Sequence, residues 1–201
     1  MSSPALTSPQ LGPAADPIAP ELLRLRDSSS VTVRASTAQD EPALLVFLSG
    51  LCLEAKRLRF FTGAADMTYA AHLAARTGAD RYGLIAHDEA GLTVGHATFV
   101  QLDRAHAEVA LEVADRLHGR GLGTLLIERL AVVAEQRGIS HFVAEVLCDN
   151  HAMLDVFREG FDARVVHHEG SEERVEFLTS TWCLAHARFA QPPTAAASSM
   201  Q

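Results

Sequence analysis

Residues 108–130 read Glu108-Val-Ala-Leu-Glu-Val-Ala-Asp-Arg-Leu-His-Gly-Arg-Gly-Leu-Gly-Thr-Leu-Leu-Ile-Glu-Arg-Leu130. In the first part of this stretch, Val109, Leu111 and Val113 alternate with other residues, which is the period of a β-strand with one buried face. After the glycines, apolar residues recur every three or four positions and predict an amphipathic helix that ends near Gly138; they are Leu122, Leu125, Leu126, Leu130 and Val133. The stretch therefore predicts a strand, a tight turn and a helix.

The turn at 118–123 exposes consecutive backbone N–H groups, because glycine occupies positions 119, 121 and 123. Unpaired N–H groups and the helix dipole both attract anions to a helix N-terminus, so we expect this turn to bind phosphate. A P-loop is excluded because no lysine follows Gly123, and a dinucleotide fingerprint is excluded because Thr124 stands where its third glycine would be. A tight turn without a ligand is the alternative interpretation.

The overall composition limits the class of protein. A chain of 201 residues, 48% of them hydrophobic, suits one domain with one core. No apolar run reaches the ~18–20 residues of a membrane span and no signal peptide is evident, so a cytoplasmic location is expected. The net charge of −8 argues against nucleic acid and anionic membranes as partners and favours a cationic substrate such as an amine.

Cysteine and histidine spacing predicts no metal and no disulfide. The cysteines at 52, 148 and 183 are far apart and odd in number, which is typical of free thiols in a reducing compartment. None of the histidines has a partner at metal-ligand spacing. A covalent route through Cys148 is a remote alternative, since no base for it is evident in the sequence.

Proline, alanine and serine dominate both ends of the chain, so we expect a disordered leader at 1–20, one domain at 21–188 and a disordered tail at 189–201. Residues 54–61 are mixed in character and receive no assignment. Periodicity and turn residues predict the other elements; they are a hairpin at 22–26 and 31–34, helices at 37–51 and 66–76, strands at 82–87, 92–100 and 141–147, a helix at 150–159, and a closing hairpin at 161–168 and 172–183.

The turn resembles the acyl-CoA-binding turn of the GCN5-related N-acetyltransferase (GNAT) superfamily, (Gln/Arg)-x-x-Gly-x-(Gly/Ala). It matches at Gly121 and Gly123 and differs at His118, where the family usually has Gln or Arg. Three further stretches look like the domain of bacterial protein lysine acetyltransferases, namely 57–61, 107–123, and 142–147 with 150–154. The resemblance covers roughly 22–184. It implies an α/β fold with a mixed, mostly antiparallel sheet, flanked by helices and splayed between its fourth and fifth main strands.

The same resemblance implies acetyl-CoA as co-substrate. In this family a strand edge, here around Leu111 and Val113, pairs with the pantetheine arm, and the amides of the turn hold the pyrophosphate. An Asn at the start of the next helix commonly bonds the arm, and Phe157 stands where many members have a tyrosine that protonates the leaving thiolate. The cofactor-binding candidates are Leu111, Val113, His118, Gly119, Arg120, Gly121, Leu122, Gly123, Thr124, Asn150, Met153 and Phe157.

Amine acylation requires a base, because an alkylammonium has a pKa of about 10.4. Glu108 and Glu112 lie on the same face of the predicted strand, roughly 13 Å apart, so they cannot both serve one reacting atom. The resemblance favours Glu108 as the general base and leaves Glu112 as the second candidate. Glu145, in an apolar strand, either lines the acceptor site or forms a structural ion pair.

The expected function is transfer of acetyl from acetyl-CoA to a primary amine by direct attack, with a protein lysine as the preferred acceptor. A small-molecule amine is the first alternative. The second is a non-catalytic acetyl-CoA-binding regulatory domain. Related lysine acetyltransferases are often joined to a ligase-like region that this sequence lacks, so a linked or separate regulatory or ligase-like domain is a possible partner.

Overall fold

The computed structural model describes residues 19–181. Residues 1–18 of the predicted leader, the whole predicted tail at 189–201 and Cys183 lie outside this range. Within it, no helix is both long and apolar enough to cross a membrane.

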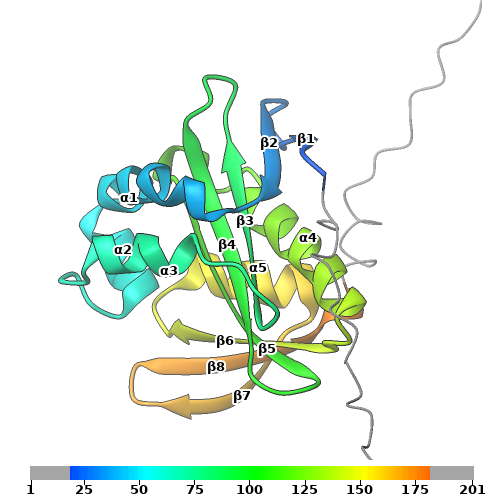
Figure 1. The fold of residues 1–201 in the computed structure, drawn as a ribbon. Coiled ribbons are helices and arrows are strands. Elements are labelled where there is room, and N and C mark those ends of the chain that lie inside the picture. The colour runs from blue at the N-terminus through cyan, green and yellow to red at the C-terminus, as the bar shows by residue number, and fades with distance from the viewer. Residues whose placement is uncertain (1–18, 182–201) are drawn as a thin grey trace, which may run out of the picture.

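One sheet of eight strands forms the centre of the molecule, in the order β1-β2-β3-β4-β5-β6-β8-β7 (Figure 1). All neighbouring strands are antiparallel except β5 and β6, which are parallel. The strands are β1 (Glu21–Arg24), β2 (Ser30–Ala35), β3 (Arg81–His87), β4 (Thr93–Gln101), β5 (His106–Val113), β6 (His141–Leu147), β7 (Arg164–Glu169) and β8 (Glu172–Leu178).

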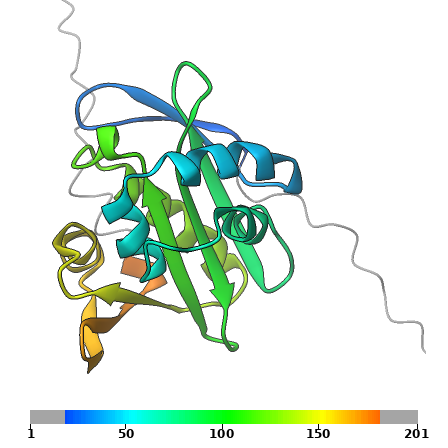
Figure 2. The same ribbon diagram turned by 90° about the vertical axis from the view of Figure 1, so that its left-hand side faces the viewer.

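Helices cover both faces of this sheet, with α1, α2 and α3 on one side and α4 and α5 on the other (Figures 1 and 2). Helix α2 packs against β5 and β6, and helix α4 packs across β3, β4 and β5. The helices are α1 (Glu41–Gly50), α2 (Leu53–Phe60), α3 (Met67–Ala74), α4 (Leu122–Gln136) and α5 (His151–Phe161), with short 3-10 turns at Ala38–Asp40, Asp115–Leu117 and Thr179–Thr181.

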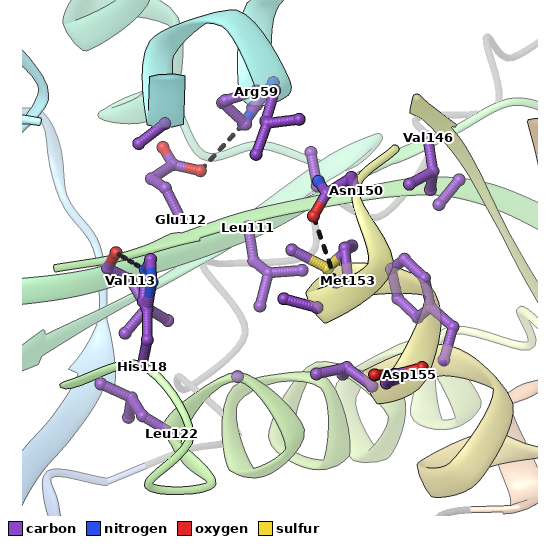
Figure 3. A pocket seen from close by; sticks show the side chains of 18 of the residues that line it. Arg59, Leu111, Glu112, Val113, His118, Leu122, Val146, Asn150, Met153 and Asp155 are labelled. Carbon is purple, nitrogen blue, oxygen red and sulfur yellow. Dashed lines mark hydrogen bonds and ion pairs between the residues drawn. The ribbon is translucent and has the colours of Figure 1, made fainter. Parts of the chain in front are cut away.

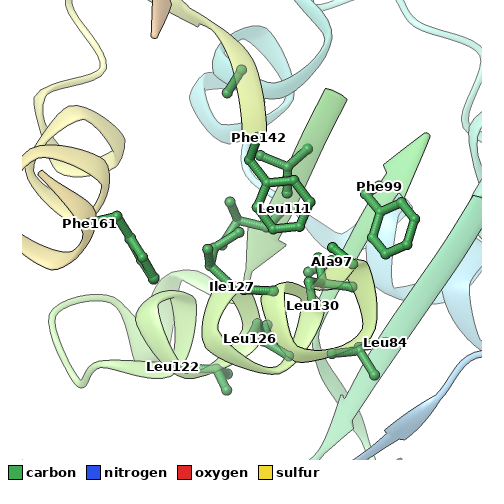
Figure 4. Close-up of a cluster of buried hydrophobic side chains, with 14 of the residues drawn as sticks. Leu84, Ala97, Phe99, Leu111, Leu122, Leu126, Ile127, Leu130, Phe142 and Phe161 are labelled. Carbon is green, nitrogen blue, oxygen red and sulfur yellow. The ribbon is translucent and has the colours of Figure 1, made fainter. Parts of the chain in front are cut away.

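The main core lies between the sheet and α4 (Figure 4). Leu126, Ile127 and Leu130 of α4 are fully buried and face Phe99 and Phe142 of the sheet. Burying each such side chain contributes about 1.5–3 kcal/mol. The stripe of leucines in the central stretch therefore fixes which face of α4 turns inward, as the sequence pattern predicted.

The parallel pairing of β5 with β6 is short, and the two strands separate where it stops, which leaves room for a site. Pairing runs only from His106 opposite His141 to Glu108 opposite Val143. Beyond that point β6 continues along β8, and among the described strands none pairs with this edge of β5. This is the predicted splay of a mixed sheet.

The sequence did not predict α2. None of its residues is buried, so it has no apolar stripe to reveal a helical period. Its start is marked by Cys52, whose sulfur accepts a hydrogen bond from the backbone N–H of Ala55 at 3.3 Å, and its end by Phe61 in the left-handed conformation. The last predicted strand, at 172–183, ends instead at Leu178, where a 3-10 turn begins.

Candidate active site

A pocket of about 770 Å³ opens where β5 and β6 separate (Figure 3). Helix α2 lies over one side of it, and the glycine turn with the first turns of α4 and α5 forms the other. Every predicted site residue except Arg120 lines this pocket. The tertiary structure therefore brings together residues that the sequence spreads over 108–157.

The glycine turn adopts a backbone that side chains would resist. Gly119 and Gly121 have φ of 74° and 88°, in the left-handed region that favours glycine. A Cβ on Gly123 would come within 3.2 Å of Leu111 Cδ1, so the missing side chain lets the turn approach β5. Helix α4, 15 residues long, begins here without a side-chain cap. The dipole and the N–H groups of its first turn are thus available to an anion in the pocket.

Arg120 does not supply the cation predicted for this turn. Its guanidinium pairs with the carboxylate of Asp27 in the β1–β2 hairpin. Arg26 of the same hairpin lines the pocket instead, with its Nε 3.3 Å from where a Cβ on Gly121 would stand. Sequence reasoning missed Arg26 because only the packing of the hairpin on the turn brings it there.

His118, which replaces the usual Gln or Arg of the turn, fastens the turn to the end of β5. Its Nε2 donates to the carbonyl oxygen of Val113 at 2.9 Å (Figure 3). A pantetheine arm that pairs with this backbone, as predicted, would share the carbonyl oxygen of Val113 with His118. The oxygen can accept both hydrogen bonds because it has two lone pairs. Leu111 lies one strand repeat closer to the splay and lines the pocket with its side chain.

Glu112 is buried and fully engaged. Its Oε2 accepts from Arg59 Nε at 2.9 Å (Figure 3), and its Oε1 lies 3.2 Å from His96 Nδ1. Burial alone would raise the pKa of Glu112, but the charge of Arg59 and the hydrogen bond from His96 outweigh it and hold the pKa at about 2. His96 Nε2 in turn lies 3.2 Å from the carbonyl oxygen of Ala74. The carboxylate thus joins α2 to β4 and β5.

Glu108 stands in a different environment on the same face of β5. It is exposed and lines the pocket. Within residues 19–181 it forms no hydrogen bond or ion pair. Both oxygens of Glu108 are therefore open to a group that enters the pocket, whereas those of Glu112 are occupied.

The start of α5 has a defined cap. The side-chain oxygen of Asn150 accepts from the backbone N–H of Met153 at 3.2 Å (Figure 3). Phe157, further along the helix, is 1% exposed, and its ring centroid lies 5.2 Å from that of Phe177. Phe157 is therefore a core side chain that also lines the pocket, and it has no hydroxyl group.

The two remaining candidates lie on or just after β6. Glu145 lines the pocket and also pairs with Arg174 at 3.4 Å, so its carboxylate forms the structural ion pair considered from the sequence. Cys148 Sγ lies 3.8 Å from His168 Nδ1, but Cys148 does not line the pocket. A covalent route through this thiol therefore has no support from the geometry.

Helix α2 is held over the pocket by a second ion pair besides Arg59–Glu112. Arg57 Nη2 bonds Asp149, which precedes α5, at 2.8 Å, and Glu54 within α2 at 2.6 Å. These contacts are polar and partly exposed, and α2 buries none of its own residues. Two ion pairs therefore hold α2 over the pocket, together with partly buried Ala55 and Phe60, which pack against the apolar cluster of α1 and α3.

The Acetyltransferase (GNAT) family matches residues 53–161, more than half of the chain. The matched segment runs from the first residue of α2 to the last residue of α5. It therefore contains β5, the glycine turn and every predicted site residue.

Similar proteins include Acetyltransferase Pat of Mycolicibacterium smegmatis, 40% identical over 68 residues, which are 33% of this chain and 20% of that protein. The chain thus matches about a fifth of the length of this curated relative. The GNAT domain of S. lividans PAT is 30% identical, with a TM-score of 0.72, over 79% of this chain and 96% of that one.

A cAMP-binding acyltransferase from Mycobacterium smegmatis shares the fold at 24% identity and a TM-score of 0.57, over 80% of this chain and 47% of that one. The mixed sheet with one parallel pair and the glycine turn beside the splay agree with these matches. The chain belongs to the GNAT acetyltransferase family.

Proposed function

We propose that this chain transfers an acetyl group from acetyl-CoA to the side chain of a protein lysine, with Glu108 as the general base. The observation that carries the proposal is the position of Glu108, an exposed carboxylate without a partner among the described residues, on the pocket side of β5. Glu112, the second candidate, becomes a positioning residue because Arg59 and His96 occupy its oxygens.

Membership of the GNAT family implies the use of acetyl-CoA, and the pocket suits it. The turn around Gly121 offers N–H groups and a helix dipole to the pyrophosphate, with Arg26 beside it. The edge of β5 beyond Glu108 is open to a strand-like ligand such as a pantetheine arm. When bound, acetyl-CoA supplies the reactive thioester.

Carboxylates in the pocket are proposed to attract and deprotonate the acceptor amine. Glu54, Glu108 and Glu145 line the pocket, and the whole chain carries a net charge of −8, so an ammonium is attracted into it. Freeing such an amine at pH 7 costs roughly 4–5 kcal/mol, because its pKa lies about 3.4 units higher. Glu108 accepts this proton as the amine attacks. Phe157 has no proton to donate, so the CoA thiolate takes its proton from water or from a more distant donor.

The acceptor class is tested by incubating the chain with acetyl-CoA and either lysine peptides or a panel of small amines and polyamines. Mass spectrometry of the products is the readout. We expect acetylated peptide lysines. Turnover of small amines alone would overturn the protein acceptor, and tight acetyl-CoA binding without any turnover would favour the regulatory-domain alternative.

A regulatory region belongs to the same proposal. One neighbour in structure is described as a cAMP-binding acyltransferase, and this chain matches about half of it. We propose that a linked or separate domain, outside the matched part, controls access of the acceptor to the pocket.

The phosphate-binding role of the turn predicts a specific effect of Gly121→Ala. Alanine at φ of +88° is strained by about 1–2 kcal/mol, and its Cβ would press on Arg26. We expect the turn to shift and acetyl-CoA affinity, measured by calorimetry, to fall about tenfold, equivalent to about 1.4 kcal/mol. Gly138→Ala is the matched control, because it has φ of +79° in open space beyond the other end of α4. It should lower stability alone, and equal affinities in the two variants would contradict this role.

Two substitutions at Asn150 separate its cap from its proposed contact with the pantetheine arm. Asn150→Ala removes the acceptor for Met153 N–H and should destabilise the fold by about 1 kcal/mol in urea unfolding. Asn150→Asp keeps that acceptor but loses the amide donor. We expect both variants to bind acetyl-CoA more weakly and only the alanine variant to lose stability. Normal affinity in Asn150→Asp would reduce Asn150 to a helix cap.

A further inference from the structure

Two histidines and a carboxylate converge at the closed end of the splay, outside the pocket. His106 Nε2 lies 3.7 Å from Glu176 Oε1, and His141 Nε2 lies 4.0 Å from the same oxygen. One donor atom from each of the three residues falls within 4.8 Å of the other two. None of the three lines the pocket.

Sheet register explains why these residues meet. His106 and His141 are the first residues of the parallel strands β5 and β6 and stand directly opposite each other, with their rings stacked at 5.0 Å. Glu176 of β8 pairs with Val143, two residues along β6 from His141. Side chains two residues apart share a face, so all three project from the face opposite α4.

The other ring nitrogen of each histidine is already bonded. His106 Nδ1 lies 2.9 and 3.0 Å from the two oxygens of Asp103, and His141 Nδ1 lies 2.8 Å from Ser140 Oγ. Asp103 is itself held by the backbone N–H groups of Ala105 and His106. A carboxylate on Nδ1 keeps the proton there and leaves the lone pair of Nε2 free, which is the arrangement around metal-bound histidines.

We propose that His106, His141 and Glu176 bind a divalent transition metal ion, with Zn²⁺ as the best match. Two imidazoles and one carboxylate are a known zinc ligand set, and bonds of about 2.0–2.1 Å place tetrahedral ligands about 3.3 Å apart. The two measured separations exceed that value by less than 1 Å, which side-chain rotation can close. The three side chains are 30–37% exposed, so water can take the fourth position.

The bound ion would tie β5, β6 and β8 together where β5 and β6 begin, on the two strands that also carry the pocket residues Glu108 and Glu145. No sequence pattern indicates this site, because its residues are separated by more than thirty positions and share no motif. A second group, Cys148, His168 and Glu173, also has three donor atoms in reach of one another. Arg158 already bonds Glu173 at 2.8 Å, so this group is weaker and is controlled for below.

The test is calorimetric titration of the full chain with ZnCl₂. We expect one ion per chain to bind in the parent and in Cys148→Ser, which disables the second group. His106→Ala and His141→Ala should each weaken binding at least tenfold. Asp103→Asn keeps a side-chain oxygen that accepts from the backbone N–H groups of Ala105 and His106 but removes the carboxylate charge, and it should weaken zinc binding about tenfold. His167→Ala, an exposed histidine of β7 outside the group, is the matched control and should bind like the parent.

Thermal unfolding gives a second readout, because an ion that binds only the folded state raises the melting temperature. ZnCl₂ should raise it in the parent and in His167→Ala but not in His141→Ala. Unchanged acetyl-CoA affinity in every variant would show that each one folds. Absence of zinc binding in the parent, or equal binding in His106→Ala and His167→Ala, would overturn the site and leave an imidazole–carboxylate ion pair.

Discussion

Glu108→Gln is expected to lower kcat by about 10²–10⁴-fold while acetyl-CoA still binds as in the parent. Glutamine has the size of glutamate but cannot accept the ammonium proton. Glu108 is exposed and without a partner among the described residues, so its replacement removes no stabilising contact seen in the structure. Steady-state kinetics with a lysine peptide and calorimetry with acetyl-CoA measure the two parts of this expectation.

Glu145→Gln provides the comparison for that result. Glu145 also lines the pocket, but it is paired with Arg174 at 3.4 Å. We expect its removal to raise the KM of the acceptor and to leave kcat at least tenfold above that of Glu108→Gln. A kcat in Glu108→Gln close to that of the parent, or a loss confined to KM, would contradict the assignment of Glu108 as the base.

The second large effect is expected at Glu112, and it is an effect on folding. Glu112→Gln leaves Arg59 and the ring of His96 facing a neutral amide in a site where the carboxylate was 5% exposed. Removing one partner of a buried ion pair costs about 3–5 kcal/mol. Urea unfolding at pH 7 should show a loss of this size. A stable Glu112→Gln variant with low kcat would instead assign the base to Glu112.

The contribution of Glu112 to the unfolding free energy is expected to fall as the pH is lowered. The pKa of Glu112 is about 2 in the folded chain and 4.5 in the reference state, so ionised Glu112 favours folding by on the order of 3 kcal/mol above pH 4.5. This contribution is lost as the pH falls from about 4.5 towards 2. The difference in unfolding free energy between parent and Glu112→Gln should therefore shrink from pH 6 to pH 3. A constant difference would mean that the carboxylate charge does not contribute.

The same ion pair positions α2. This helix has no buried residue, and Arg59–Glu112 and Arg57–Asp149 fasten it over the pocket. Weakening the first contact should loosen the wall of the pocket as well as the fold. We therefore expect the identity of residue 112 to affect activity through the position of α2.

Local sequence patterns were enough to predict the central strand, the glycine turn and α4. Each is a local pattern, in which alternation selects one face of β5, left-handed φ angles select glycine at 119 and 121, and a leucine stripe selects the buried face of α4. All of the site residues named from the sequence, apart from Arg120, line one pocket.

The environments of the charged residues depend instead on tertiary contacts. Periodicity placed Glu108 and Glu112 on one face alike, but Arg59 of α2 and His96 of β4 reach only Glu112. Arg26 reaches the turn, and His106 meets His141, through strand packing alone. Protonation and free lone pairs depend on which groups lie within a few ångströms, and such contacts between distant parts of the chain leave no periodic trace in the sequence.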